Sequence, residues 1–217
     1  MSLQDDLFAT ASAPRTEHLA DQTVLLRGRA LADAGELLQA LNAIVRAAPF
    51  RHMHTPGGFR MSVAMSNCGD WGWISDRRGY RYTREDPDSG RAWPGMPPVL
   101  RALSQAAAAE AGFADFQPDA CLINRYEPGA RMTLHQDRNE RDFSAPIVSI
   151  SLGLPAVFQL GGAERKDRAQ RVPLCHGDIL VWGGADRLRF HGVLPLKAGH
   201  HPQLGAMRIN LTLRKAA

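Results

Sequence analysis

Three side chains that commonly bind metals stand in a spacing typical of an open iron site. His135 and Asp137 are separated by one residue, and His191 follows 54 positions after the aspartate. Two imidazoles and one carboxylate can hold one face of an iron(II) ion and leave its other positions open for an oxidant and a co-substrate. A structural zinc site would instead close all four positions, usually with cysteines. The triad therefore predicts a catalytic iron centre, although H-x-D on its own is common by chance.

Polar and apolar side chains alternate over residues 207–214, near the carboxyl end of the chain. Residues two apart in a strand share a face, so one face would pack on a core while the other presents two guanidiniums, an amide and a hydroxyl. If the iron binds a dicarboxylate that carries a keto group, an arginine of this strand can take the far carboxylate as a two-point ion pair. The ordinary alternative is a solvent-exposed face. The polar residues are Arg208, Asn210, Thr212 and Arg214, and Asn124 shares a face with Tyr126 in another expected strand.

The elements that must position these residues indicate a mixed α+β fold that is mainly β. A capping-box pattern at Asp33 and Glu36 predicts a helix that ends before Pro49, and a second helix should run from Pro97 to Gly112. Short strands separated by Gly, Pro, Asn and Asp are expected at 24–27, 120–126, 147–152, 156–160, 171–175, 179–182, 189–193 and 207–213. Such strands suggest an antiparallel sandwich or jelly roll, whose mouth can hold a metal and a small ligand.

The segment between the two helices has a different character. Residues 50–94 contain seven of the chain's fifteen aromatic residues, together with many glycines and arginines, and their apolar periodicity is poor. Such a segment could be a recognition surface that stacks flat ligands, or a cover over the core with its aromatics buried. Arginines cluster at 77–84, 125–141 and 165–171, and the guanidinium suits phosphate oxygens and base faces. The alternative for these clusters is a solvated basic surface.

Composition sets the broad class of protein. The chain has 217 residues, 44% hydrophobic and 22% charged, which fits one globular domain. A net charge of +4 permits a polyanionic partner without demanding one. Three distant cysteines indicate reduced thiols that act as small buried hydrophobes. The amino terminus lacks a secretory pattern and no stretch reaches the roughly 20 apolar residues of a membrane span, so we expect a soluble, cytoplasmic protein that needs no membrane.

Long runs of the sequence resemble a known family. The runs at 119–137, 146–155, 176–184 and 208–214, with shorter ones at 55–59, 61–69 and 79–80, are similar to the bacterial AlkB family of iron(II)- and 2-oxoglutarate-dependent dioxygenases, which repair alkylated nucleic-acid bases. The likeness extends from about residue 20 to the end of the chain. It implies one domain over 1–217, with an amino-terminal arm at 1–22, a nucleotide-recognition lid at about 49–94, flanking helices, and a double-stranded β-helix core at about 117–214.

The resemblance also implies roles for individual residues. His135, Asp137 and His191 would be the catalytic iron ligands. Arg214 would bind the distal carboxylate of 2-oxoglutarate, with Arg208 near its metal-side end. The rest of that pocket would be Asn124, Tyr126, Met132, Asn210 and Thr212. The substrate contacts would be Thr55, Met61, Met65, Trp73, Tyr80, Arg131, Thr133, Asn139, Glu140, Arg165 and Trp182, with Trp73 and His135 sandwiching the damaged base.

The implied activity is oxidative demethylation of N1-methyladenine or N3-methylcytosine in DNA, and in single-stranded DNA and RNA as well. The N-alkyl group is hydroxylated and released as formaldehyde, while 2-oxoglutarate and O2 yield succinate and CO2. The implied partner is alkylated nucleic acid with a flipped base, bound by a monomer without an obligate protein partner. Two departures from the family pattern stand out: Asn139 replaces an aspartate that helps to read the base, and Met132 replaces a leucine.

Two other functions fit the same residues. The iron site could hydroxylate a protein side chain or a small molecule, with the aromatic segment as a general hydrophobic cover. The chain could also be a catalytically inactive binding module, although the intact triad and both arginines argue against this.

Overall fold

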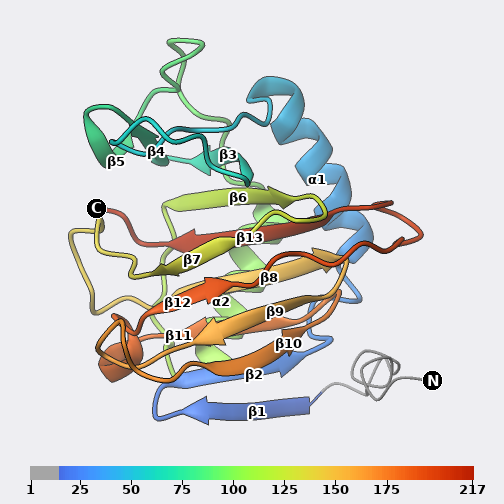
Figure 1. Ribbon diagram of the computed structural model, residues 1–217. Coiled ribbons are helices and arrows are strands. Elements are labelled where there is room, and N and C mark those ends of the chain that lie inside the picture. Colours follow the sequence, from blue (N-terminus) through green and yellow to red (C-terminus); the bar gives the residue numbers. More distant parts are fainter. Residues whose placement is uncertain (1–14) are drawn as a thin grey trace.

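Two antiparallel β-sheets form the body of the molecule (Figure 1). The computed structural model describes residues 15–217. The larger sheet contains β1 (Arg15–Ala20), β2 (Thr23–Arg27), β3 (Ala64–Gly69), β6 (Ala120–Tyr126), β8 (Ile147–Gly153), β11 (Ile179–Trp182) and β13 (Arg208–Arg214). The smaller sheet contains β7 (Met132–His135), β9 (Ala156–Leu160), β10 (Gln170–Leu174) and β12 (His191–Val193). A separate hairpin is formed by β4 (Gly72–Asp76) and β5 (Gly79–Thr83), and the helices are α1 (Ala34–Ala47) and α2 (Pro98–Glu110).

The order of the strands follows the double-stranded β-helix. Neighbours in the larger sheet run β1-β2-β11-β8-β13-β6-β3, and those in the smaller sheet run β10-β9-β12-β7. From β6 to β13 the chain crosses between the two sheets at every step except from β9 to β10, which are neighbours in the smaller sheet. The expected fold, mainly β with a jelly-roll core and flanking helices, is confirmed.

Burial divides the core into two layers. The helices cover the outer face of the larger sheet, where Leu37 and Leu100 are buried in one cluster with Leu211 (Figure 1). A second cluster lies between the sheets and joins Leu180 of the larger sheet to Phe158 of the smaller one. Because side chains alternate along a strand, the residues of β13 that do not face the helices must point into the space between the sheets.

The structure corrects three expectations about local elements. The loosely packed arm predicted at 1–22 is wrong for residues 15–20, which form β1 and pair with β2; residues 1–14 lie outside the described residues. The capping box at Asp33 is not formed, since this N-cap residue has helical backbone angles and makes no side-chain cap bond. Strands β3, β4, β5 and β7 were not predicted, because their sequences are short or rich in glycine and aromatic residues.

Residues 49–94, which we call the cover segment, combine both expected characters. Strand β3 joins the edge of the larger sheet, and the β4–β5 hairpin lies above it (Figure 1). Trp93 is buried in the core, whereas Phe59 and Tyr80 are 77% and 45% exposed. Part of the segment thus covers the core, and part presents aromatic rings to solvent. Among residues 15–217, no helix is long and apolar enough to cross a membrane.

Candidate iron and co-substrate site

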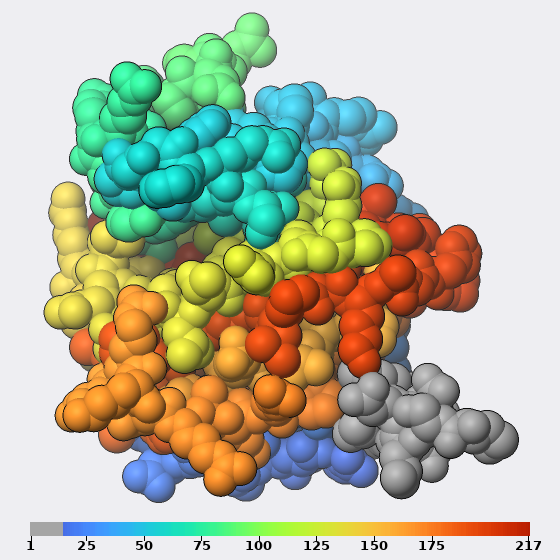
Figure 2. Space-filling model, in the orientation of Figure 1, coloured from blue at the N-terminus to red at the C-terminus, as the bar shows by residue number. Residues whose placement is uncertain are grey.

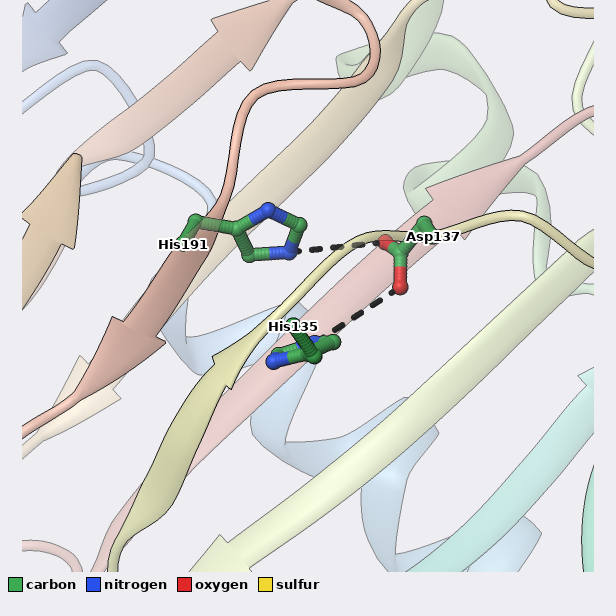
Figure 3. A group of neighbouring side chains, drawn as sticks. All are labelled: His135, Asp137 and His191. Atoms are coloured by element: carbon green, nitrogen blue, oxygen red, sulfur yellow. Dashed lines mark ion pairs between the residues drawn. The ribbon is translucent and has the colours of Figure 1, made fainter. Parts of the chain in front are cut away.

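The three expected iron ligands converge at one end of the smaller sheet (Figure 3). His135 ends β7 and lies directly opposite His191, the first residue of β12. Asp137 follows β7 by two residues, and each histidine Nε2 lies 3.7 Å from one of its carboxylate oxygens. The ligand atoms all lie within 4.8 Å of one another, so a single ion could contact all three.

Close approach of the two strands makes this convergence possible. Gly192 follows His191, and a Cβ atom at this position would stand 2.7 Å from the carbonyl oxygen of Met132. Real Cβ atoms do not approach this closely, so β12 can lie against β7 only if this residue is glycine. The sequence F-H-G around His191 therefore has a structural reason.

Backbone hydrogen bonds orient both imidazoles. Nδ1 of His135 lies 2.9 Å from the carbonyl oxygen of Thr133, and Nδ1 of His191 lies 3.0 Å from that of Arg189. A carbonyl can only accept, so each Nδ1 carries the proton and each Nε2 keeps its lone pair for a metal. The ring of His191 is further held by Phe158, stacked at 5.8 Å, and by Trp182, edge-on at 5.1 Å.

Charge around Asp137 favours the ionised carboxylate that a metal needs. Burial opposes ionisation, but the charge of Arg214 and the neighbouring His191 and His135 hold the pKa of Asp137 well below its usual range. Arg214 donates from Nε and Nη2 to the same oxygen, Oδ2, at 3.0 and 2.7 Å. Burial, reinforced by His135, lowers the pKa of His191 to about 4, so this ligand is neutral at physiological pH. The triad is thus ready to bind a divalent cation.

A buried arginine that the sequence reading missed supports the loop after β7. Arg187 is 2% exposed and donates to the carbonyl oxygens of Asp137 at 3.0 Å and Ala145 at 3.1 Å. It also lies 3.2 Å from the carboxylate of Glu140, which accepts a 2.7 Å hydrogen bond from Tyr82. These contacts fix the segment that carries the metal-binding carboxylate.

One cavity of about 830 Å³ contains the triad and nearly all other predicted site residues. Figure 2 shows a hollow in the surface between the cover segment and the yellow residues near position 140. The cavity is lined by Thr55, Met61, Met65, Trp73, Tyr80, Asn124, Tyr126, Arg131, Met132, Thr133, Asn139, Arg165, Trp182, Arg208, Asn210, Thr212 and Arg214, together with the triad. Glu140 does not line it: the predicted base contact lies instead among Tyr82, Arg187 and Arg214, because a buried carboxylate needs such partners.

The polar face of β13 points into this cavity, so the solvent-exposed alternative is wrong. Its four polar side chains are each at most 7% exposed. Asn210 donates to Ser149 Oγ at 2.7 Å and accepts from Asn124 and Thr212 at 3.2 and 2.9 Å. Ser149 and Ser151, on neighbouring β8, were missed; two serines spaced by two in an apolar strand were the signal that could have revealed them.

Arg208 is the part of this face that lacks an anionic partner. It is 1% exposed, its guanidinium lies 5.2 Å from the Tyr126 ring centre, and Nη2 donates to Ser151 at 3.0 Å. Its Nε and Nη1 find no hydrogen-bond partner among the described residues. Burial lowers the pKa of Arg208, since no carboxylate of the described chain pairs with it. A buried cation with free N–H groups fits an anionic ligand.

The order of the two arginines differs from the expected one. Arg214, expected at the distal carboxylate, pairs with the iron ligand Asp137, whereas Arg208 lies at the opposite end of β13. Six residues of extended strand separate their Cα atoms by about 20 Å. Arg214 is therefore at the metal end of the cavity, and the free N–H groups of Arg208 mark its other end.

Aromatic side chains of the hairpin form the rim of the cavity. The rings of Trp73 and Tyr80 stack with centres 5.6 Å apart and an interplanar angle of 13°. Trp73 Nε1 donates to Asn139 Oδ1 at 3.1 Å, which joins the hairpin to the loop after β7. A flat face of Trp73 can thus serve as a wall of the cavity, since Tyr80 covers the other.

These features define an open iron site with a built place for an anionic co-substrate. The two imidazoles and one carboxylate fit iron(II), and the unpartnered N–H groups of Arg208 fit a carboxylate of 2-oxoglutarate. The chain belongs to the 2OG-Fe(II) oxygenase superfamily, whose model matches residues 23–214. The expected enzyme class, an iron(II)- and 2-oxoglutarate-dependent dioxygenase that uses O2, is confirmed.

Similar proteins indicate which group of these oxygenases the chain resembles. The chain is 55% identical over 212 residues to the alpha-ketoglutarate-dependent dioxygenase AlkB of Salmonella typhimurium, covering 98% of both proteins. It is 35% identical over 116 residues, 53% of this chain and 30% of the relative, to the human nucleic acid dioxygenase ALKBH1. Among solved structures, that of OsALKBH1 matches with a TM-score of 0.80 and 27% identity, over 93% of this chain and 100% of that one. The expected resemblance to bacterial AlkB is confirmed.

Proposed function

We propose that the protein oxidatively removes alkyl groups from nucleic-acid bases, with N1-methyladenine and N3-methylcytosine as its substrates. The observation that carries the proposal is that the His–Asp–His triad and the stacked Trp73–Tyr80 pair line the same cavity. An aromatic wall suits a flat base, and the metal triad lies within the space that the base would enter. The names of the relatives, AlkB and nucleic acid dioxygenase, support the same substrate class.

The chain would hold its co-substrate along β13. In this proposal Arg208 binds the distal carboxylate of 2-oxoglutarate through its free N–H groups, assisted by Tyr126 and Asn124. Asn210 and Thr212 line the middle of the pocket, and Arg214 keeps Asp137 ionised and oriented at the metal end. When bound, iron(II), 2-oxoglutarate and O2 together would supply the oxidation that converts the N-methyl group to a hydroxymethyl group, whose C–N bond then breaks to release formaldehyde and return the proton to the base.

The chain would hold the base between two rings. A methyl group on the pairing edge is hidden inside a duplex, so the base must be flipped or already single-stranded. We assign Trp73 and His135 to its two faces, and Met61, Met65, Met132 and Trp182 to the cavity walls. We assign Thr55, Tyr80 and Arg165, which line the cavity with hydroxyl and guanidinium groups, to contacts with a phosphate, and Arg131 and Thr133 to further substrate contacts. The cover segment is then the nucleotide-recognition lid and residues 117–214 the catalytic core.

The direct test uses one methylated oligonucleotide. The protein is loaded with iron(II) and 2-oxoglutarate without air, then exposed to oxygen together with a single strand bearing one N1-methyladenine. Mass spectrometry should show loss of one methyl group with stoichiometric succinate. Succinate without methyl loss would reject this substrate and favour hydroxylation of a protein or small molecule.

Replacement of Trp73 tests the aromatic wall. Trp73→Ala removes one stacking surface, worth about 1–3 kcal/mol per base, so KM for the methylated strand should rise roughly 5- to 100-fold. Iron and 2-oxoglutarate binding, followed by the charge-transfer absorption of their anaerobic complex, should not change. Trp73→Phe keeps a ring but loses the bond to Asn139, and should retain most of the affinity. Unchanged KM in the alanine variant would make Trp73 a packing residue only.

Replacement of Asn139 tests base selection. The side-chain oxygen of Asn139 already accepts from Trp73, so only its second lone pair remains for an exocyclic amino group. Asn139→Asp adds a second acceptor oxygen and a negative charge. We expect KM for N1-methyladenine to fall about threefold or more relative to N3-methylthymine, which has no amino group. An unaltered ratio of the two values would exclude the position from base selection.

A further inference from the structure

Two arginines share one tryptophan at the seam between the cover segment and the loop after β7. The guanidinium carbon of Arg84 lies 4.6 Å from the centre of the Trp71 ring, and that of Arg141 lies 5.9 Å from it. Trp71 is half-buried, whereas both arginines are exposed. The two ends of the β4–β5 hairpin and the loop after β7 thus place two cations on a single indole.

The backbone at each of these residues is tied down. Trp71 N–H donates to the carbonyl oxygen of Asp119 at 3.2 Å, and Arg141 N–H donates to that of Ala216 at 3.1 Å. The carbonyl oxygen of Arg84 accepts from Trp93 N–H at 3.4 Å. A guanidinium stacked on a ring keeps its N–H groups directed outward in its own plane. The fold itself therefore brings both guanidiniums over the indole.

Neither guanidinium is neutralised within the described part of the chain. Two other arginines of the cover segment are neutralised by ion pairs. Arg51 pairs with Asp86 and Asp88, and Arg81 pairs with Asp76. Arg84 and Arg141 have no carboxylate within 4.0 Å among residues 15–217. Of the exposed acids next to them in sequence, Asp142 accepts from Ser144 N–H, and Glu85 forms no ion pair with a described residue. Two adjacent unpaired cations at an exposed position suit a phosphate.

Arg84 and Arg141 lie close to the rim of the cavity. At the rim, Trp73 donates a hydrogen bond to Asn139. Trp71, two residues before Trp73, contacts Arg141, two residues after Asn139, so the two segments are antiparallel here. Two residues of extended chain span about 7 Å. The hairpin lies near the carboxyl terminus at the left of Figure 1, and Arg141 N–H donates to Ala216, next to that terminus.

We propose that Arg84 and Arg141, held on Trp71, bind a backbone phosphate of the substrate strand beyond the nucleotide whose base enters the cavity. The inference rests on the proposed function and adds a binding site outside the cavity to it. Exposed Arg138, on the cavity lining between Asp137 and Asn139, extends the positive track toward the mouth. Proteins that hold single strands combine such a track with aromatic platforms.

The test compares a long and a short substrate. Arg84→Gln combined with Arg141→Gln removes both cations, and Arg46→Gln combined with Arg171→Gln removes the same charge at exposed sites outside the cavity lining as a control. For a methylated 15-nucleotide single strand, KM should rise roughly 3- to 10-fold in the double variant, and the slope of log affinity against log salt should become shallower by about 0.7 for one lost phosphate contact. For a methylated nucleoside 5′-monophosphate, which has no phosphate beyond its own nucleotide, KM should stay the same.

Binding without turnover separates this inference from the proposed function. Fluorescence anisotropy of an unmethylated 15-nucleotide strand, with the iron-free protein, should show the same weakening and the same change in salt slope. A charge-retaining variant, Arg84→Lys combined with Arg141→Lys, should keep the salt slope of the unaltered protein but less of its affinity, since lysine stacks poorly. If the unaltered protein demethylates neither substrate, the proposed function fails while anisotropy still decides this site.

Two results would overturn the site. The first is a double glutamine variant that behaves like the control variant in KM, anisotropy and salt slope. The second is an equal rise in KM for the monophosphate and the long strand, which would mean that the pair supports the cavity and binds no outer phosphate. The thermal midpoints of the variants should agree with the unaltered protein, because both arginines are exposed.

Discussion

Replacing Asp137 by alanine should reduce 2-oxoglutarate turnover to background. Loss of outer-shell partners alone commonly costs about 10- to 100-fold in metal affinity or activity, so loss of a ligand should exceed about 100-fold. The same change leaves the buried Arg214 without its closest carboxylate. Breaking a buried ion pair from one side costs about 3–5 kcal/mol, so the free energy of unfolding should fall as well.

The two effects can be separated with a second variant. Asp137→Asn keeps the side-chain shape and an oxygen for Arg214, so more of the unfolding free energy should remain than in the alanine variant, while iron binding should still be weak. Urea unfolding and anaerobic iron titration measure the two quantities independently. Asp115→Ala removes an exposed acid away from the cavity and should change neither. Near-normal iron binding and turnover in Asp137→Ala would reject the metal assignment.

The sequence predicted the part of the site that local chemistry determines. H-x-D places two ligands close together at a strand end, and alternation in residues 207–214 correctly separated the core-facing side of β13 from the cavity-facing side. Strands β6, β9 and β11 were predicted with their observed bounds, because each is a short apolar run between turn residues. Alternation of apolar and polar residues reveals a strand and its two faces within a few residues of sequence.

The parts that were missed depend on contacts between distant segments. Arg187 looks like any surface arginine in the sequence, yet its contacts with Asp137, Glu140 and Ala145 come from a segment more than forty residues earlier. Glu140 was assigned to the base by the family resemblance alone; the structure pairs it with Arg187 and Arg214, which no local pattern connects to it. The cover segment has poor periodicity, so β3 and β4 gave no strand signal.

The sequence also could not predict which end of β13 lies near the metal ligands. Alternation shows which residues share a face, but it does not show which end of the strand reaches the metal. The loop after β7 determines this, because it brings Asp137 to Arg214. That contact places Arg214 beside the proposed metal ligand, so we propose that Arg208, and not Arg214, binds the distal carboxylate of 2-oxoglutarate.

Replacing Arg208 by alanine should raise the KM for 2-oxoglutarate strongly while leaving iron binding largely intact. Truncating one member of a buried, hydrogen-bonded charge pair costs about 2–5 kcal/mol, which is roughly 30-fold or more in affinity. Arg208 has N–H groups free for this contact among the described residues, whereas Arg214 already uses its own on Asp137. Arg208→Lys retains the charge but not the two-point geometry, so it should recover only part of the affinity.

Arg214→Ala provides the matched comparison, because it removes the same side chain from the other end of the same strand face. Its main effect should be on iron affinity, about 10- to 100-fold, as expected for the partner of a ligating carboxylate. Anaerobic titrations of iron and of 2-oxoglutarate, each with the other in excess, distinguish the two variants. If Arg214→Ala weakened 2-oxoglutarate binding more than Arg208→Ala did, the distal carboxylate would lie at Arg214, and the free N–H groups of Arg208 would need another ligand.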